Sequence, residues 1–221
     1  MPLPTFVGAA RTENLAGTVN ATLPPGLQAG DLLLVFGTRS NQNALAAQGF
    51  TETQFTGYWG GVDATPPFKI SNGAEVIPVE LNWAYVLLAF RGVGSLNNIG
   101  QYGQEDSNTW DITSGTGLNV LEDNSVVVYF MLQNTIWPIS DANVLGPHGT
   151  APTVEIPFTT NSGTRTIAYE IFASSSPGIV RSGFTDPYSF DLATSLTFGP
   201  LPPPAEPAGG IDPTNRRRRR S

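Results

Sequence analysis

The sequence has no cysteine, which excludes disulfide bonds and metal sites built from thiolates. Only 13% of the 221 residues are charged, about half of the roughly 25% that is usual in soluble domains. No apolar run reaches the roughly 18 residues of a membrane-spanning helix, and the first segment, MPLPTFVGAARTEN, has no basic start followed by an apolar run. No stretch repeats apolar residues at the spacing of an amphipathic helix. We therefore expect no membrane span, no secretory signal and no helical framework.

Glycine and proline are plentiful instead, at 24 and 19 residues, which is typical of many short strands joined by tight turns. Four apolar runs lie between turn-forming residues, and a run without polar alternation indicates a strand that is covered on both faces. These predicted central strands are DLLLVFG (residues 31–37), WAYVLLAF (83–90), SVVVYFML (125–132) and TIAYEIFA (166–173).

Shorter segments with alternating apolar residues predict amphipathic strands, namely TFVGAA (5–10), GTVNATL (17–23), FTETQF (50–55) and SLTF (195–198). Ser71-Asn72-Gly73 predicts a hairpin, because Asn and Gly both accept positive φ. The polar stretch 96–121 predicts a long loop with a short strand around Trp110. The whole pattern predicts an all-β fold, a single antiparallel β-sandwich that is jelly-roll-like and covers residues 1–198.

Residues 199–221 have a different composition and read GPLPPPAEPAGGIDPTNRRRRRS. Proline favours an extended backbone, so we expect an extended, Pro-rich C-terminal arm outside the sandwich. Five of the eleven basic residues are in this arm, all in Arg216–Arg220, whereas the chain outside this arginine run has six basic and eighteen acidic residues. The arm residues expected to bind a partner are Pro202, Pro203, Pro204, Arg216, Arg217, Arg218, Arg219 and Arg220.

The arginine run has three interpretations: it contacts nucleic-acid phosphates, it docks on an acidic protein surface, or it is a solvated tail. No aromatic residue interrupts it, so stacking on bases is not indicated. The acidic character of the remaining chain argues against a nucleic-acid-binding face on the domain. A proline-rich spacer rises about 3.1 Å per residue, which suits a tether that crosses a neighbouring subunit.

Residue patterns for catalysis or cofactor binding are sparse. His148 is the single histidine, and nothing near it in the sequence suggests a nucleophilic triad. The acidic pairs Glu105-Asp106 and Glu122-Asp123 are sequence neighbours, which point to opposite faces of a strand and form no two-carboxylate site alone. Calcium-loop and phosphate-loop motifs are missing. We therefore expect a chain that is not an enzyme and has no catalytic residue, cofactor or metal.

Tyr58 and Trp59 precede two glycines and are the best candidates for a surface aromatic contact. Aromatic side chains on a loop either stack on a sugar ring or pack against protein. We prefer core or interface packing for this pair. Trp83 starts an apolar run and is expected in the core.

Turn motifs recur beside the apolar runs. A Pro-x-Gly-x-x-x-Gly-Asp turn precedes the first run in LPPGLQAGDLLLVF, GFTET follows it, Ala-Phe-Arg-Gly-Val ends the second run (89–93), and Asp-Asn-Ser leads the third in LEDNSVVVYF (123–125). Together these segments resemble a β-sandwich domain family of tailed-bacteriophage virion structural proteins and related bacterial surface proteins. The resemblance extends over residues 5–198 and leaves out the arm. The usual tryptophan after Gly49 is Phe50 here.

This resemblance implies a virion or surface role without catalysis. The chain is short, has no heptad segment for a fibre stalk and ends in an extended arm, which favours a capsid decoration or cement protein that staples neighbouring capsomers. We expect synthesis in the host cytoplasm and a place on the capsid surface of the virion, as a homo-oligomer in contact with the major capsid protein or other virion proteins. The alternatives are a tail or baseplate component, a carbohydrate-binding module for host attachment, and, least favoured, a hydrolase in which distant acids such as Glu80 and Glu170 converge.

Overall fold

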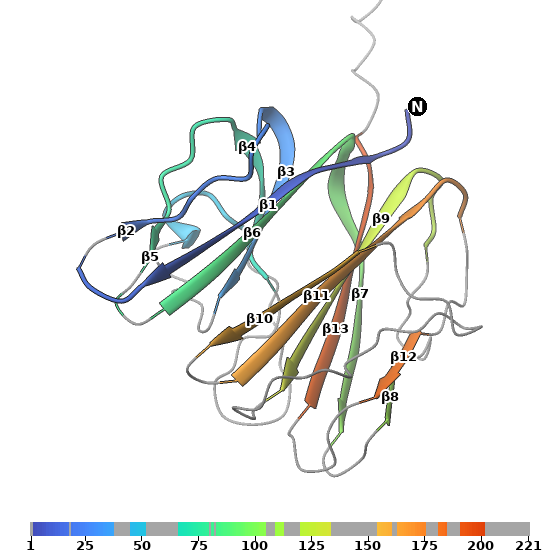
Figure 1. The fold of residues 1–221 in the computed structure, drawn as a ribbon. Helices are drawn as coiled ribbons and strands as arrows, with labels where there is room; N and C mark the ends of the chain where they lie inside the picture. Colours follow the sequence, from blue (N-terminus) through green and yellow to red (C-terminus); the bar gives the residue numbers. More distant parts are fainter. Residues whose placement is uncertain are drawn as a thin grey trace, which may run out of the picture.

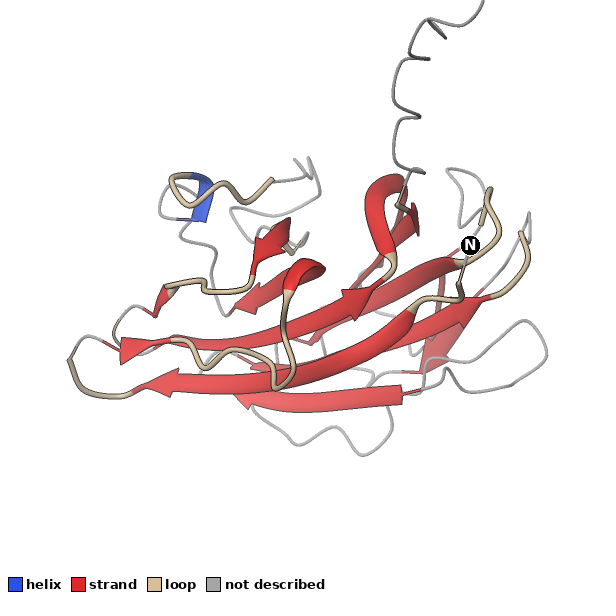
Figure 2. Cartoon of the chain, turned by 90° about the horizontal axis from the view of Figure 1, so that it is seen from above, coloured by secondary structure: helices blue, strands red, loops and turns tan. Residues whose placement is uncertain are grey.

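The computed structural model describes residues 2–17, 19–37, 45–51, 66–79, 81, 83–104, 109–112, 120–133, 154–160, 163–175, 181–184 and 191–201. Within these residues the chain forms antiparallel β-sheets. A short helical turn at residues 45–46 lies outside the sheets (Figure 2). The predicted all-β antiparallel fold is therefore confirmed.

Two sheets form the body of the protein (Figure 1). The first sheet has the strand order β1 (Thr5–Asn14), β6 (Trp83–Arg91), β3 (Ala29–Gly37) and β4 (Phe68–Asn72). The second has the order β10 (Val154–Thr160), β11 (Gly163–Phe172), β9 (Ser125–Gln133), β13 (Asp191–Pro200) and β7 (Val93–Gln104). Two short pairs are formed by β2 (Val19–Asn20) with β5 (Pro78–Val79) and by β8 (Thr109–Ile112) with β12 (Arg181–Phe184).

The four apolar runs become β3, β6, β9 and β11, and each of them has a paired strand on both sides. Successive side chains of β3 point to opposite faces of the sheet, as in any strand. Leu32, Leu34 and Phe36 belong to the core between the two sheets. Leu33 and Val35 belong to a second core, which segments around Leu45 and Ile77 close on the outside of the first sheet. The absence of polar alternation in β3 and β6 thus follows from burial on both faces.

The core between the sheets takes its buried residues from both of them. Phe6 of β1 stacks on Tyr169 of β11, with ring centroids 4.7 Å apart. Phe68 of β4 meets Phe198 of β13 edge-on at 5.1 Å. Because aromatic rings from one sheet contact rings from the other, the arrangement is consistent with the predicted β-sandwich.

The chain completes the first sheet before it starts the second. β6 passes into β7 through Gly92, which has a φ of +87° that glycine adopts without strain. The later strands β9, β10, β11 and β13 all pair within the second sheet. A jelly roll winds its strands back and forth between two sheets, so the strand order departs from the jelly-roll-like detail of the prediction.

Three local predictions are corrected by the pairing. Residues 96–104, expected in a loop, belong to β7 and pair with β13, because cross-strand contacts outweigh the weak strand propensity of Asn and Gly. The turn at Gly73 forms, but β4 pairs with β3 and β5 with β2, so no hairpin joins β4 to β5. β13 continues to Pro200, which extends the folded body two residues beyond the predicted boundary at residue 198.

Candidate attachment site at the root of the C-terminal arm

The residues that the sequence singles out for partner binding lie outside the described residues. They are Tyr58, Trp59, Pro202, Pro203, Pro204, Arg216, Arg217, Arg218, Arg219 and Arg220, and the same is true of His148 and Glu105-Asp106. The structure does describe the residues that flank these segments, namely Leu201 before the arm and Thr51 and Pro66 on either side of the segment with Tyr58 and Trp59. The candidate sites consist of these flanking residues and their neighbours.

The root of the arm is Leu201, which follows β13 directly. Its amide N–H donates a 3.4 Å hydrogen bond to the carbonyl oxygen of Gly92. Its side chain lies where a Cβ of residue 94 would be, so glycine at position 94 allows Leu201 to contact the backbone of β7. Leu201 is thus held at the bend where β6 passes into β7, and Gly92 at this bend also approaches Pro4, which precedes β1.

Exposed apolar side chains surround this root. Leu201 is 39% exposed and Ile70 of β4 is 41% exposed, and both approach the same Cβ position at Gly94. Leu121, in the turn before β9, is 61% exposed. Single exposed leucines are common, but Leu201 and Ile70 meet at Gly94, and Leu121 directly precedes Glu122, whose carboxylate lies at Gly199, so these side chains make a surface that suits contact with a partner.

Acidic side chains complete this surface. Glu122 lies over Gly199, two residues before Leu201, and Asp123 follows it in the exposed turn that leads into β9. One oxygen of Asp123, Oδ1, accepts a 2.8 Å hydrogen bond from the amide N–H of Ser175. We use the name arm-root surface for the set Ile70, Leu121, Glu122, Asp123 and Leu201.

The basic side chains that the structure describes are all engaged elsewhere. Their ion pairs are Arg11 with Glu13, Lys69 with Glu75 and Arg91 with Asp31. None of these three basic side chains is paired with Glu122 or Asp123. The arm-root surface therefore presents negative charge that no described side chain neutralises.

Two of the turn motifs meet in space. Asp31, from the Gly-Asp turn before β3, is buried, and Arg91, from the end of β6, donates from Nε and one terminal nitrogen to the two carboxylate oxygens at 2.8 and 2.9 Å. The same arginine donates to the carbonyl oxygen of Gly26 at 3.1 Å, and the amide of Gln28 donates to Asp31 at 2.8 Å. The hydrogen bond to Asp31 raises the pKa of Arg91 above its ordinary value. This bidentate pair, together with the hydrogen bond to Gly26, holds the Pro-Gly turn against the end of β6.

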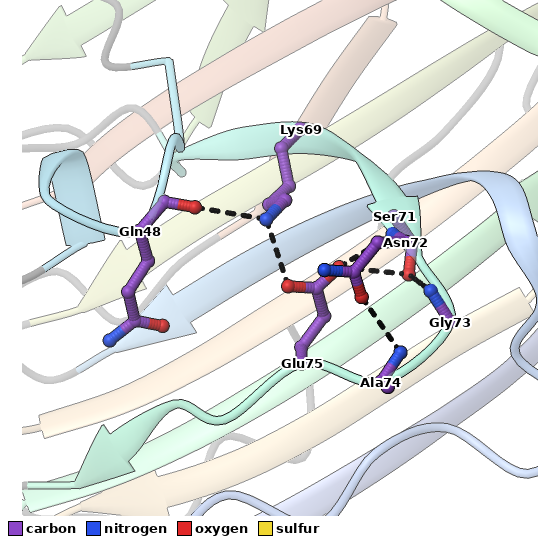
Figure 3. Close-up of polar contacts among 7 residues, drawn as sticks. All are labelled: Gln48, Lys69, Ser71, Asn72, Gly73, Ala74 and Glu75. Carbon is purple, nitrogen blue, oxygen red and sulfur yellow. Dashed lines mark hydrogen bonds and ion pairs between the residues drawn. The ribbon is translucent and has the colours of Figure 1, made fainter.

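A second ion pair joins Lys69 of β4 to Glu75, a buried residue in the turn that follows this strand (Figure 3). Lys69 Nζ donates to Glu75 Oε2 at 2.8 Å and to the carbonyl oxygen of Gln48 at 2.9 Å. Glu75 Oε1 also accepts from the Ser71 hydroxyl at 3.1 Å and from the Asn72 amide at 2.7 Å. The carboxylate thus has three donors, which is what a buried charge needs to be tolerated.

The Lys69–Glu75 pair also positions the segment that leads to the predicted aromatic site. Lys69 lies 5.3 Å from the centroid of the Phe50 ring, a cation–π distance. Thr51 and Phe68 exchange two backbone hydrogen bonds of 2.7 and 3.1 Å, which hold the ends of the intervening chain together. Tyr58 and Trp59 are within that chain, so their segment starts and ends on a fixed base. The sequence did not reveal this lysine, because neither its ion pair nor its burial has a sequence motif.

The described residues contain no group of three or more His, Cys, Asp or Glu side chains arranged to hold a metal ion. None of the helical structure that is described is long and apolar enough for a membrane crossing. Comparison with protein-family models and with curated proteins gave no match to this chain. The features that bear on function are therefore the arm, its root and the charges described above.

Proposed function

We propose that this chain is a non-enzymatic structural protein of a tailed-phage virion, and more specifically a capsid decoration or cement protein. In this proposal the β-sheet body sits on the outside of the capsid as one of many copies. The C-terminal arm extends from each body and fastens neighbouring capsomers together. Its partners are the major capsid protein or other virion proteins.

The observation that supports this proposal is the rigid root of the arm. Leu201 is attached to the body by its hydrogen bond to Gly92 and by its packing on Gly94. A basic, proline-rich segment follows this fixed point, whereas the rest of the chain carries a large excess of acidic residues. A tether transmits force and position to its domain only if its root is fixed, and an extended tether adds contact area without a second folded domain.

The location and copy number of the protein in purified particles test this proposal. We expect many copies spread over the capsid surface in a symmetry-averaged electron-microscopy map, with density that crosses between capsomers. A few copies confined to the tail would instead show a tail or baseplate component. Absence of the protein from particles would reject a virion role altogether.

A carbohydrate-binding role is the second candidate, and the fixed base of the segment around Tyr58 and Trp59 favours it. Binding residues are often placed on loops whose ends are held by a rigid scaffold, as Thr51 and Phe68 are here. A glycan array probed with the full chain tests this role. Binding that is lost in Tyr58→Ala and Trp59→Ala would support it, and binding to no glycan would reject it.

A further inference from the structure

We propose that the arm-root surface of one copy binds the C-terminal arm of a second copy of this chain. The inference rests on the proposed function, in which the arm is the fastener, and it names the surface that receives the arm. Glu122 and Asp123 supply the charge of that surface, and Ile70, Leu121 and Leu201 supply its apolar part.

Charge complementarity is the first argument. Arg216–Arg220 form the densest positive charge in the sequence. Glu122 and Asp123 are exposed, and the basic side chains that the structure describes, Arg11, Lys69 and Arg91, are paired with other acids. A guanidinium group binds a carboxylate with two parallel hydrogen bonds, so two neighbouring carboxylates suit a run of arginines.

The apolar part of the surface suits the residues that precede the arginines. Ile211 and Pro213 lie within five residues of Arg216, so they reach the surface together with the arginine run. Proline-rich segments bind to exposed apolar side chains with little loss of conformational entropy, because their extended backbone is already restricted. The exposed side chains of Leu121, Ile70 and Leu201 provide such a surface.

The length of the arm favours a second copy over the arm's own body. The fifteen residues from Leu201 to Arg216 span about 45 Å at about 3.1 Å per residue when they are extended as their prolines favour. A folded body of this size has a radius of gyration of about 16 Å. An extended arm therefore carries its arginines past its own body to an adjacent one.

This geometry also predicts the type of assembly. The arm and the arm-root surface are different parts of the chain, so each copy gives one arm and accepts one arm. Two copies that exchange arms with each other form a closed two-fold dimer. Copies that give an arm to one neighbour and accept an arm from another form rings when the rotation between copies closes and open chains when it does not.

A charge-reversal experiment on the full chain tests the proposal. We would measure self-association by sedimentation velocity for the wild type, for Arg216–Arg220→Glu and for Glu122→Arg/Asp123→Arg. Far-UV circular dichroism checks that each variant is folded. Glu13→Arg is the matched control, because Glu13 is exposed but lies about 30 Å along β1 from the arm root.

We expect salt-sensitive association of the wild type and of the control, and association at least about tenfold weaker in each reversed variant. An equimolar mixture of the two reversed variants should regain association, because a glutamate arm then meets an arginine surface. A wild type that stays monomeric at every concentration would overturn the inference, and so would a reversed variant that associates normally or a mixture without rescue. Particle attachment is measured separately, so a monomer that still attaches to particles would leave the proposed function standing.

Discussion

Asp31 and Glu75 are the buried acidic residues among the side chains that the structure describes, and both depend on basic residues from neighbouring structure. Arg91 is 60 positions from Asp31, and Lys69 reaches Glu75 across the turn at the end of β4. Burial of a carboxylate without a partner costs several kcal/mol, so each pair is a requirement of the fold rather than an addition to it. At the scale of single residues, the stability of the fold therefore depends on the pairing of each buried carboxylate with a basic side chain.

Replacing Lys69 with methionine should remove the charge that balances Glu75 while it preserves most of the apolar stem. We expect a loss of about 3 kcal/mol in the free energy of unfolding, because the carboxylate stays buried with only the Ser71 and Asn72 donors. Urea denaturation measures this loss. Arg11→Met is the control, since the Arg11–Glu13 pair is exposed and should contribute less than about 1 kcal/mol. Equal losses in the two variants would contradict this account.

The decrease in the free energy of unfolding at acidic pH should depend on Glu75. Burial raises the pKa of Glu75, but the Lys69 hydrogen bond and charge, the Asn72 amide and the Ser71 hydroxyl together lower it below its ordinary value of 4.5. A carboxyl group with a lower pKa in the folded state contributes stability above the unfolded pKa and loses it as the pH falls through the folded pKa.

The stability advantage of the wild type over Glu75→Gln should therefore shrink below about pH 4.5. Urea unfolding of both proteins from about pH 6 to about pH 3 measures this difference. A difference that stays constant over the whole range would show that the ionised form of Glu75 has no special stabilisation.

At the scale of secondary-structure elements, the turn that follows β4 is the most constrained part of the first sheet. Gly73 has a φ of +86°, and a Cβ at this position would be 2.9 Å from the amide nitrogen of Ala29. Gly73→Ala should cost more than about 2 kcal/mol, because it combines a strained φ with a clash against backbone.

Gly17→Ala is the matched control for this substitution. Gly17 has a φ of +94° but no atom within 4 Å of its Cβ position, so only the cost of the strained φ, about 1 kcal/mol, applies. Thermal or urea unfolding of the two variants gives the comparison. Similar losses at the two sites would mean that the turn moves away from Ala29 without cost.

The elements that the sequence predicts best are those whose burial is complete. β3 and β6 follow from uninterrupted apolar runs, because a strand between two other strands and two cores has no need for polar residues. β9 and β11 follow from similar runs, which contribute residues to the core between the sheets. β7 was missed because it is an edge strand whose Asn and Gly residues have weak strand propensity, and its pairing with β13 is a long-range contact. The predicted strand at residues 17–23 is reduced to β2, because its apolar residues pack on the first sheet without a long partner strand.

The candidate site could be predicted only in part from the sequence. Composition alone separates the arm from the body, so the arm could be proposed from its prolines and arginines. Its root could not, because the contact of Leu201 with Gly92 and Gly94 joins residues about a hundred positions apart. Pairings such as Asp31 with Arg91 likewise depend on the register between β3 and β6, which no local pattern specifies.

At the scale of the whole molecule, two sheets form the body of the described residues, and the arginine run follows this body in the sequence. The two sheets share one aromatic and aliphatic core, and β13 ends beside the bend that joins β6 to β7. Stability and attachment should therefore be separable properties. The core supplies the first, and the arm together with the arm-root surface supplies the second.

The most direct test of this separation is a deletion of Pro202–Ser221 that keeps Leu201 on Gly94. The measurement is the amount of protein bound per particle when wild type and deletion variant are added to purified particles that lack the protein. We predict that the variant unfolds at the same temperature as the wild type within about 2 °C, while its occupancy on the particle falls at least about tenfold. Occupancy equal to that of the wild type would contradict the account, because the body alone would then be sufficient for attachment.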